Sequence, residues 1–247
     1  MNYSRYLKYL IKSDSLLSGR LFSAYSNHLP SEEWYDEEFE FIADQKLRQR
    51  IVEEFSGIRF AYKLYEGIGA ENENLIFEIR HQIFAYATIF EAVLHYVLYT
   101  YYTDTTEFHE LQYHSAPAKI SIPSGKLQKL NDLLEHHGET IIPYHIQERK
   151  KDESQIRFDD KCKTAEKLGL ISSYTSPSGE IVNLPDEIIE VYSYRNAIHL
   201  VAEQRKGIEY ELDLSKRAYR RMRPFIDQIK YKLQQDKKGI YSDFTNT

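Results

Sequence analysis

The stretch from Asn72 to Tyr102, NENLIFEIRHQIFAYATIFEAVLHYVLYTYY, decides the fold of this 247-residue chain. Its apolar and aromatic residues fall on nearly every side of a helical wheel, which is typical of a central helix surrounded by neighbours. Glu91 and His95 lie within it, and a membrane span carries far fewer ionisable groups at its centre. We therefore predict a buried helix of a soluble protein that does not associate with a membrane.

The composition is that of a globular protein. The chain is 42% hydrophobic and 28% charged, which allows a core and excludes a disordered chain. Its single cysteine, Cys162, excludes an internal disulfide and a cysteine zinc site, and it favours a reducing compartment. The N-terminus shows no secretory signal. The sequence therefore predicts a cytoplasmic protein, with no metal site and no cofactor.

The charge is distributed unevenly along the chain. The formal net charge is −6, which does not by itself indicate nucleic-acid binding. The stretch from Arg205 to Lys238, however, holds eleven Lys or Arg against five Asp or Glu, a local balance of +6 that leaves −12 for the rest. A phosphate-facing helix and an ordinary solvated amphipathic helix both fit this pattern.

Helical periodicity recurs on both sides of the central stretch. Apolar residues spaced by three and four predict helices at about 3–11, 44–65, 126–136, 159–168, 185–203 and from 215 onward. In the helix at 126–136 we expect Leu127, Leu130, Leu133 and Leu134 to face inward. The predicted fold class is mainly α, built on about four core helices.

The predicted domain organisation has two parts. Residues 1–70 form an N-terminal helical extension, and residues 71–247 form a helical bundle. A small irregular insertion interrupts this bundle at about 139–183, where periodicity is weak.

The most specific local feature is the segment from Tyr194 to Leu200, YRNAIHL. On a continuous helix Arg195 and His199 are about 40° apart, so both project from one face. A guanidinium can bind phosphate oxygens, and an imidazole beside it can transfer a proton. Asn196 adds a donor and an acceptor. This set suits attack by an RNA 2′-hydroxyl on its own phosphodiester, although an Arg and a His one turn apart also occur by chance in many helices.

An Arg-Asn followed shortly by His, late in a helical chain and after a long apolar helix, resembles the HEPN superfamily (higher eukaryotes and prokaryotes nucleotide-binding domains). The resemblance covers roughly residues 72–103, 125–138 and 185–238. It implies an up-and-down four-helix bundle that is commonly dimeric. Many members are metal-independent ribonucleases of toxin–antitoxin, abortive-infection and CRISPR-linked defence systems.

The match to the HEPN motif is incomplete. Family members place four to six residues between Arg and His, whereas three separate Arg195 from His199 here. The shorter spacing marks either a divergent subgroup or a bundle that has lost cleavage activity. Residues 1–70 and 139–183 have no counterpart in the HEPN family pattern.

A second set of polar residues lies on the central helix. Arg80, Glu91 and His95 share one stripe of the helical wheel. Family members often carry an acidic residue on an early helix that faces the Arg–His pair, and the resemblance assigns this place to Glu91, in contact with Arg195. A purely structural Arg–Glu pair in the bundle core is the alternative, because buried charges are rarely left unpaired.

The basic C-terminal helix supplies candidate RNA ligands. They are Arg217, Arg220, Arg221 and Arg223, with Tyr219 among them to stack a base. An ordinary exposed helix explains them equally well. The histidines His136 and His137 suit a helix C-terminus better than a metal site.

Two functions from different classes fit these residues. The first is a metal-independent endoribonuclease of a prokaryotic toxin or phage-defence system, in which Arg195, Asn196, His199 and Glu91 form a composite site in a homodimer. The second is a non-catalytic HEPN-like module that binds nucleotide, RNA or a protein partner such as an antitoxin. The intact Arg-Asn-His trio favours the first function, and the short spacing and acidic body favour the second.

Overall fold

The computed structural model describes residues 32–134, 139, 141–196 and 210–242. Within these ranges the protein is mainly helical, with eight α-helices and four strands. The described residues form two compact units. The main unit contains those up to Thr103 together with those from Phe158 onward, and the second unit is Asp104–Arg157. The predicted α class is confirmed.

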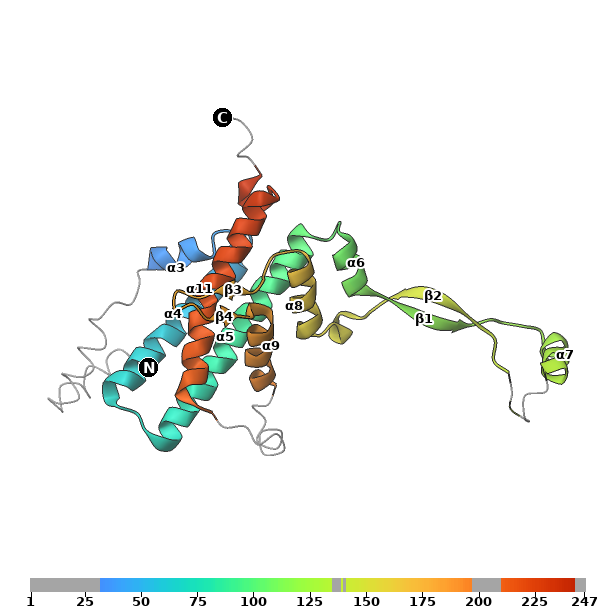
Figure 1. The fold of residues 1–247 in the computed structure, drawn as a ribbon, viewed down its shortest axis with the longest axis horizontal. Helices are drawn as coiled ribbons and strands as arrows, with labels where there is room; N and C mark the ends of the chain where they lie inside the picture. The colour runs from blue at the N-terminus through green and yellow to red at the C-terminus, as the bar shows by residue number, and fades with distance from the viewer. Residues whose placement is uncertain (1–31, 135–138, 140, 197–209, 243–247) are drawn as a thin grey trace. The chain divides into compact units, whose positions relative to one another are not determined.

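The main unit is built around α5, Asn72–Tyr101. Helices α4 (Gln45–Ile68), α9 (Leu184–Arg195) and α11 (Leu212–Gln235) all pack against it (Figure 1). Thirteen residues of α5 are buried, from Glu78 to Leu98. This arrangement has the character of a helical bundle, and the up-and-down order of a HEPN bundle stays a prediction.

The ends of α4 follow from local chemistry. The Asp44 carboxylate accepts hydrogen bonds from the backbone N–H groups of Lys46 and Leu47, which caps the first turn. Gly69 ends the helix with φ 64° and ψ 49°, a left-handed conformation that Gly adopts without steric cost. Short helix α3 (Glu32–Glu38) precedes α4 and supplies the buried ring of Tyr35 to the core.

Helices α9 and α11 enclose the other sides of the core. The Asn183 side chain accepts from the Asp186 N–H, and Pro185 occupies the first turn of α9. Helix α11 begins at Leu212, three residues before the predicted start at residue 215, and Ser215 is buried. Phe90 of α5 meets Phe225 of α11 edge to face, with ring centroids 4.9 Å apart.

Smaller elements complete the main unit. Helix α8 (Phe158–Lys167) packs against α5 and α9. Strands β3 (Tyr174–Thr175) and β4 (Ile181–Val182) pair as a short antiparallel hairpin. A single 3-10 turn, η2 (Gly239–Tyr241), follows α11.

The second unit is a β-hairpin with short helices. Strands β1 (Tyr113–Lys119) and β2 (Tyr144–Lys150) pair antiparallel, with Tyr113 opposite Lys150. Helix α6 (Thr106–Gln112) precedes β1, α7 (Ser124–Leu134) lies between the strands, and the 3-10 turn η1 (Glu153–Gln155) follows β2.

These two units differ from the predicted domain boundaries. Helix α4 falls within the predicted extension, but it packs on α5 in the main unit because Ile51, Phe55 and Ile58 are buried there. Helix α8 falls within the predicted irregular insertion, yet it belongs to the same core. The segment that leaves the main unit is Asp104–Arg157, which begins well before residue 139.

The inward-facing leucines predicted for 126–136 are a second correction. No residue of α7 is buried, and Leu133 is 78% exposed. Periodicity indicates an amphipathic helix in this segment, but it carries no information on whether another element covers the apolar side. The predicted helix at 3–11 and residues His136 and His137 lie outside the described residues.

One described helix, α5, is long and apolar enough to cross a membrane. In its most apolar window, 56% of the residues are buried inside the protein. The core helix of a soluble protein passes the same length and composition test, so this finding is weak support for a membrane span. The absence of membrane association stays a prediction.

Candidate functional site

The candidate site is a contact between α5 and α9 made by Glu91, Tyr192 and Arg195, which we call the Arg195 site. Glu91 accepts two hydrogen bonds through its two carboxylate oxygens. Its Oε1 accepts from the Tyr192 hydroxyl at 3.0 Å, and its Oε2 accepts from Nη1 of Arg195 in an ion pair. The predicted contact between Glu91 and Arg195 is therefore confirmed, whereas a catalytic role for either residue stays a prediction.

Aromatic rings surround the guanidinium of Arg195. Its Cζ lies 5.4 Å from the ring centroid of Phe84 and 5.1 Å from that of Tyr192, within the range of cation–π attraction. Phe158 of α8 stacks on Tyr192 at 4.1 Å and holds that ring in place. The Arg195 and Glu91 side chains keep 25% and 30% of their surface exposed. The pair is thus fixed in position but still reachable from solvent.

The polar stripe predicted on α5 continues along the same side. His95 lies one turn beyond Glu91, and its Nδ1 is 3.2 Å from Nζ of Lys161 on α8. Its ring also stacks on Tyr99 at 4.2 Å. Arg80, at the other end of the stripe, lies 4.9 Å from the ring centroid of Tyr210. Arg80, Glu91 and His95 thus contact side chains from three different segments, namely Tyr210, Arg195 and Lys161.

The remaining motif residues lie at the end of α9. Helix α9 ends at Arg195, and Asn196 is its exposed C-cap, with φ −68° and ψ −16°. The Asn196 backbone N–H donates to the carbonyl of Tyr192. His199 lies outside the described residues, so its predicted place on the Arg195 face stays a prediction.

Burial determines the chemistry of two neutral groups near the site. Burial and then the Glu91 contact raise the pKa of the Tyr192 hydroxyl, so Tyr192 keeps its proton and acts as a hydrogen-bond donor. Burial and the charge of Asp159 raise the pKa of the Cys162 thiol well above its ordinary range. A buried, protonated thiol is a poor nucleophile, so Cys162 is a core residue of α8.

The arginines of α11 contact carboxylates instead of forming one free basic surface. Arg217 pairs with Glu190 at 2.9 Å, and Arg221 holds both oxygens of Glu187 at 2.5 and 3.2 Å. These two arginines connect α11 to α9 and are structural partners of that helix. The predicted RNA-binding role of Arg217 and Arg221 stays a prediction.

The other two α11 arginines lie nearer to solvent. Arg223 contacts Glu38 at 2.8 Å and Asp227 at 3.0 Å. Arg220 lies 4.0 Å from Asp213, and both side chains are largely exposed, so this attraction is weak. Of the four predicted RNA ligands, Arg220 is therefore the one whose charge is most available to a ligand.

The described residues contain no cluster of three or more His, Cys, Asp or Glu side chains that could hold a metal ion. The Arg195 site offers one carboxylate, which already binds an arginine and a tyrosine. What this site can supply is positive charge and hydrogen-bond donors for an anion.

Two residues of this region, Tyr192 and Lys161, make contacts that are not among the predictions from the sequence. Tyr192 precedes Arg195 by three residues, so helical spacing alone places both on one side of α9. Lys161 carries no such signal, because nothing in the sequence indicates that α8 brings its side chain to His95. Tyr192 was therefore predictable, and Lys161 was not.

No protein-family model, curated protein or solved structure matches this chain. The resemblance to the HEPN superfamily thus rests on the residues of the chain itself. Of its motif, the described residues include Arg195, Asn196 and the matching acid Glu91.

Proposed function

We propose that the protein is a metal-independent endoribonuclease that acts at the Arg195 site. The observation that carries this proposal is the Glu91–Arg195 ion pair, which fixes a guanidinium at a solvent-reachable edge of the bundle. The HEPN resemblance adds the biological setting, a prokaryotic toxin or phage-defence system in the cytoplasm. RNA is the proposed substrate.

The geometry of Arg195 suits the binding of phosphate. A guanidinium has five N–H donors, and the contact with Glu91 is made by Nη1. The remaining donors can reach phosphate oxygens, and the fixed position of the group avoids the entropic cost of ordering it during the reaction. In this proposal Arg195 stabilises the charge that develops on the phosphorus oxygens as the 2′-hydroxyl attacks.

Glu91 and Tyr192 are positioning residues in this proposal. Glu91 holds Arg195, and Tyr192 donates to the other oxygen of the same carboxylate. His199 is proposed as the group that transfers a proton between the 2′-hydroxyl and the leaving 5′-oxygen. Asn196, exposed at the end of α9, is proposed to contact the RNA.

We also propose that the protein acts as a homodimer through the exposed side of α5. Phe77 and Phe84 lie seven residues apart on this helix, which places them on one side, and both are exposed. Phe84 is also the ring that Arg195 covers. A second copy packed on this surface would bury the two rings and bring two Arg195 sites close to each other.

A non-catalytic binding module is the second candidate. The sequence features that favour it are the three residues, rather than four to six, between Arg195 and His199, and the acidic balance of the chain outside Arg205–Lys238. In that case the protein binds RNA, a nucleotide or a protein partner and cleaves nothing.

Incubation of the purified protein with RNA in EDTA distinguishes the two candidates. A ribonuclease of this type leaves a 2′,3′-cyclic phosphate, and both His199→Ala and Arg195→Ala lower the rate by about 10²–10⁴-fold. Arg48→Ala is the matched control, because Arg48 is also a partly buried arginine in an ion pair, with Asp36 at 3.1 Å. RNA binding without cleavage supports the binding module, and cleavage that requires Mg²⁺ contradicts the proposed mechanism.

A further inference from the structure

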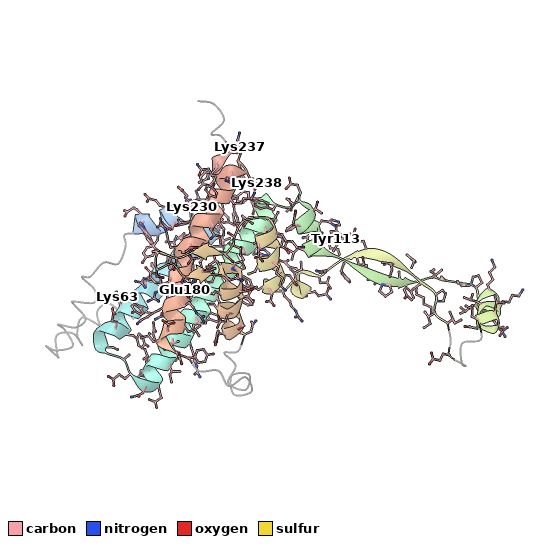
Figure 2. All side chains as sticks on the ribbon, in the orientation of Figure 1. Lys63, Tyr113, Glu180, Lys230, Lys237 and Lys238 are labelled. Carbon is pink, nitrogen blue, oxygen red and sulfur yellow. The ribbon has the colours of Figure 1, made fainter. Side chains whose placement is uncertain are left out.

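A cavity of about 320 Å³ lies between α4, α5 and α11 in the main unit. Its lining includes four basic side chains, Arg59, Lys63, Lys216 and Arg220, and no acidic residue among the described ones. Figure 2 labels Lys63 on α4. We call this space the cationic cavity. It is separate from the Arg195 site, because Gln82 of its lining leaves α5 about 180° away from Glu91.

Two of the four cations have no carboxylate partner among the described residues. Arg59 lies over the ring of Tyr219, with its Cζ 3.8 Å from the centroid, and Lys216 has no ion pair within the described ranges. The arginines on the α9 side of the same helix behave differently, since Arg217 and Arg221 both bind glutamates. At the cavity, Arg59 and Lys216 thus keep a positive charge that no described carboxylate neutralises, whereas glutamates of α9 neutralise Arg217 and Arg221.

The hydroxyl of Tyr86 is a second, independent feature of this cavity. Tyr86 is fully buried and lines the cavity, and its hydroxyl oxygen lies beside the Arg59 guanidinium, without a hydrogen bond of normal geometry among the described residues. A guanidinium can only donate, so this contact leaves the hydroxyl hydrogen without an acceptor, and an unsatisfied buried donor is destabilising. Burial raises the pKa of Tyr86 despite the charge of Arg59, so the hydroxyl keeps its proton and can donate to an acceptor in the cavity.

Acidic residues line the adjoining space, and Asp213 is a weak, exposed partner of Arg220 at 4.0 Å. A second cavity of about 220 Å³ shares Tyr62, Gln82 and Lys216 with the first, and its lining includes Glu66 and Glu78. Glu66 lies 2.6 Å from Lys63 and neutralises it at this boundary. The anionic part of any ligand therefore belongs beside Arg59, Lys216 and Arg220, in the cationic cavity.

We propose that the cationic cavity binds a small phosphate-bearing compound, whose phosphate is held by Arg59, Lys216 and Arg220 and accepts a hydrogen bond from the Tyr86 hydroxyl. Three cations with one neutral donor match a multiply charged oxyanion better than a single carboxylate. The volume is at the lower end of the range for small-molecule sites. This ligand site is independent of the proposed ribonuclease activity.

Calorimetric titration of the full chain with pyrophosphate, in buffer containing EDTA, tests the proposal. We expect saturable binding of one pyrophosphate per chain at concentrations up to about 1 mM. Arg59→Gln and Lys216→Gln should each weaken it by about tenfold or more, and Tyr86→Phe, which keeps the ring, by several-fold. Thermal unfolding of each variant shows whether it is folded.

Arg223→Gln is the matched control. Arg223 lies on the same helix as Arg220 with similar exposure, but it already binds Glu38 and Asp227 and does not line the cavity. Its replacement should leave pyrophosphate binding unchanged. The proposal is overturned by wild-type protein that shows no saturable binding, or by an equal loss of affinity in the control. Binding of an RNA oligonucleotide that depends on Arg59, without any binding of pyrophosphate, would overturn it as well and identify the cavity as part of an RNA groove.

Discussion

Arg221 of α11 and Glu187 of α9 form a two-pronged ion pair, with Nε to Oε2 at 2.5 Å and Nη2 to Oε1 at 3.2 Å. Their side chains are only 12% and 18% exposed. Little water screens the attraction at this depth, and removal of one partner leaves the other charge buried and unpaired. The pair therefore fixes how the first turn of α9 packs on α11, whereas Arg195 lies at the other end of α9.

Arg221→Ala should lower the free energy of unfolding by about 2 kcal/mol or more, because it leaves Glu187 without its partner. Urea denaturation measures this change. Arg220→Ala, one position earlier and largely exposed, should change stability by less than about 0.5 kcal/mol. Equal stability losses in the two variants would show that the pair with Glu187 has no special role.

Much of the main unit was predictable from the sequence, because its helices are long and their boundaries have local causes. The span of α5 was predicted almost to the residue, and Asp44 and Gly69 mark the ends of α4 through capping chemistry. The contact between Glu91 and Arg195 was predicted from the HEPN resemblance.

Long-range features were not predictable in the same way. Strand β1 contains Pro117, a residue that is unusual inside a strand, so its sequence does not indicate a strand. Its partner β2 lies far away in the sequence, so the pairing of the two strands has no local signal. The charge pattern of α11 could not show that Glu187 and Glu190 of α9 neutralise Arg221 and Arg217, because ion pairs between helices depend on how the helices pack.

The hairpin unit should be separable from the main unit. Tyr113 and Lys150 are paired across β1 and β2, so a short Gly-Ser turn can replace residues 114–149. The hairpin hydrogen bonds run between its own strands, and we expect the melting temperature of the shortened protein to change by less than about 4 °C. Scanning calorimetry measures this change.

Phe90→Ala in the full chain is the positive control, because it should lower the melting temperature by weakening the core. Phe90 is fully buried against Phe225, so its truncation should cost about 3–5 kcal/mol. A shortened protein that melts as early as the Phe90→Ala variant would contradict the independence of the hairpin unit.

Glu78 makes stability depend on pH. It is buried on α5, and burial raises its pKa above the ordinary value of 4.5, although Gln82, which donates to it at 2.7 Å, and His81 lower it. A raised pKa in the folded state means that ionisation costs stability. This cost is absent below pH 4.5 and is incurred as the pH rises through the folded-state pKa.

Glu78→Gln should therefore be more stable than the wild type at pH 7, and this advantage should disappear at about pH 4. The amide oxygen of the new side chain can still accept the hydrogen bond from Gln82. Urea denaturation at both pH values measures the difference, with Glu33→Gln on the surface of α3 as the control. A Glu78→Gln variant that loses stability at pH 7 would show that the charge of Glu78 stabilises the fold.

The proposed homodimer predicts that a charge on the exposed side of α5 separates the two copies. Phe77 is 63% exposed, and Phe77→Glu should shift the wild-type dimer to a monomer in light scattering. Ile181→Glu, which replaces an exposed apolar residue on β4, should leave the dimer intact. A wild-type protein that is monomeric at high concentration would exclude a composite site.

Glu91→Gln tests whether the carboxylate positions Arg195 for catalysis. The single amide oxygen can accept from Tyr192 or from Arg195 but not from both, and the substitution removes the negative charge that fixes the guanidinium. If the ribonuclease proposal holds, a displaced guanidinium should lower the cleavage rate by about 10–10²-fold, while the pH at which the rate is half-maximal, set by the proton-transfer group, stays the same. Tyr192→Phe, which leaves the ion pair in place, should have a smaller effect. A rate that rises in Glu91→Gln would contradict this positioning role and mean that Glu91 restrains Arg195 by neutralising its charge.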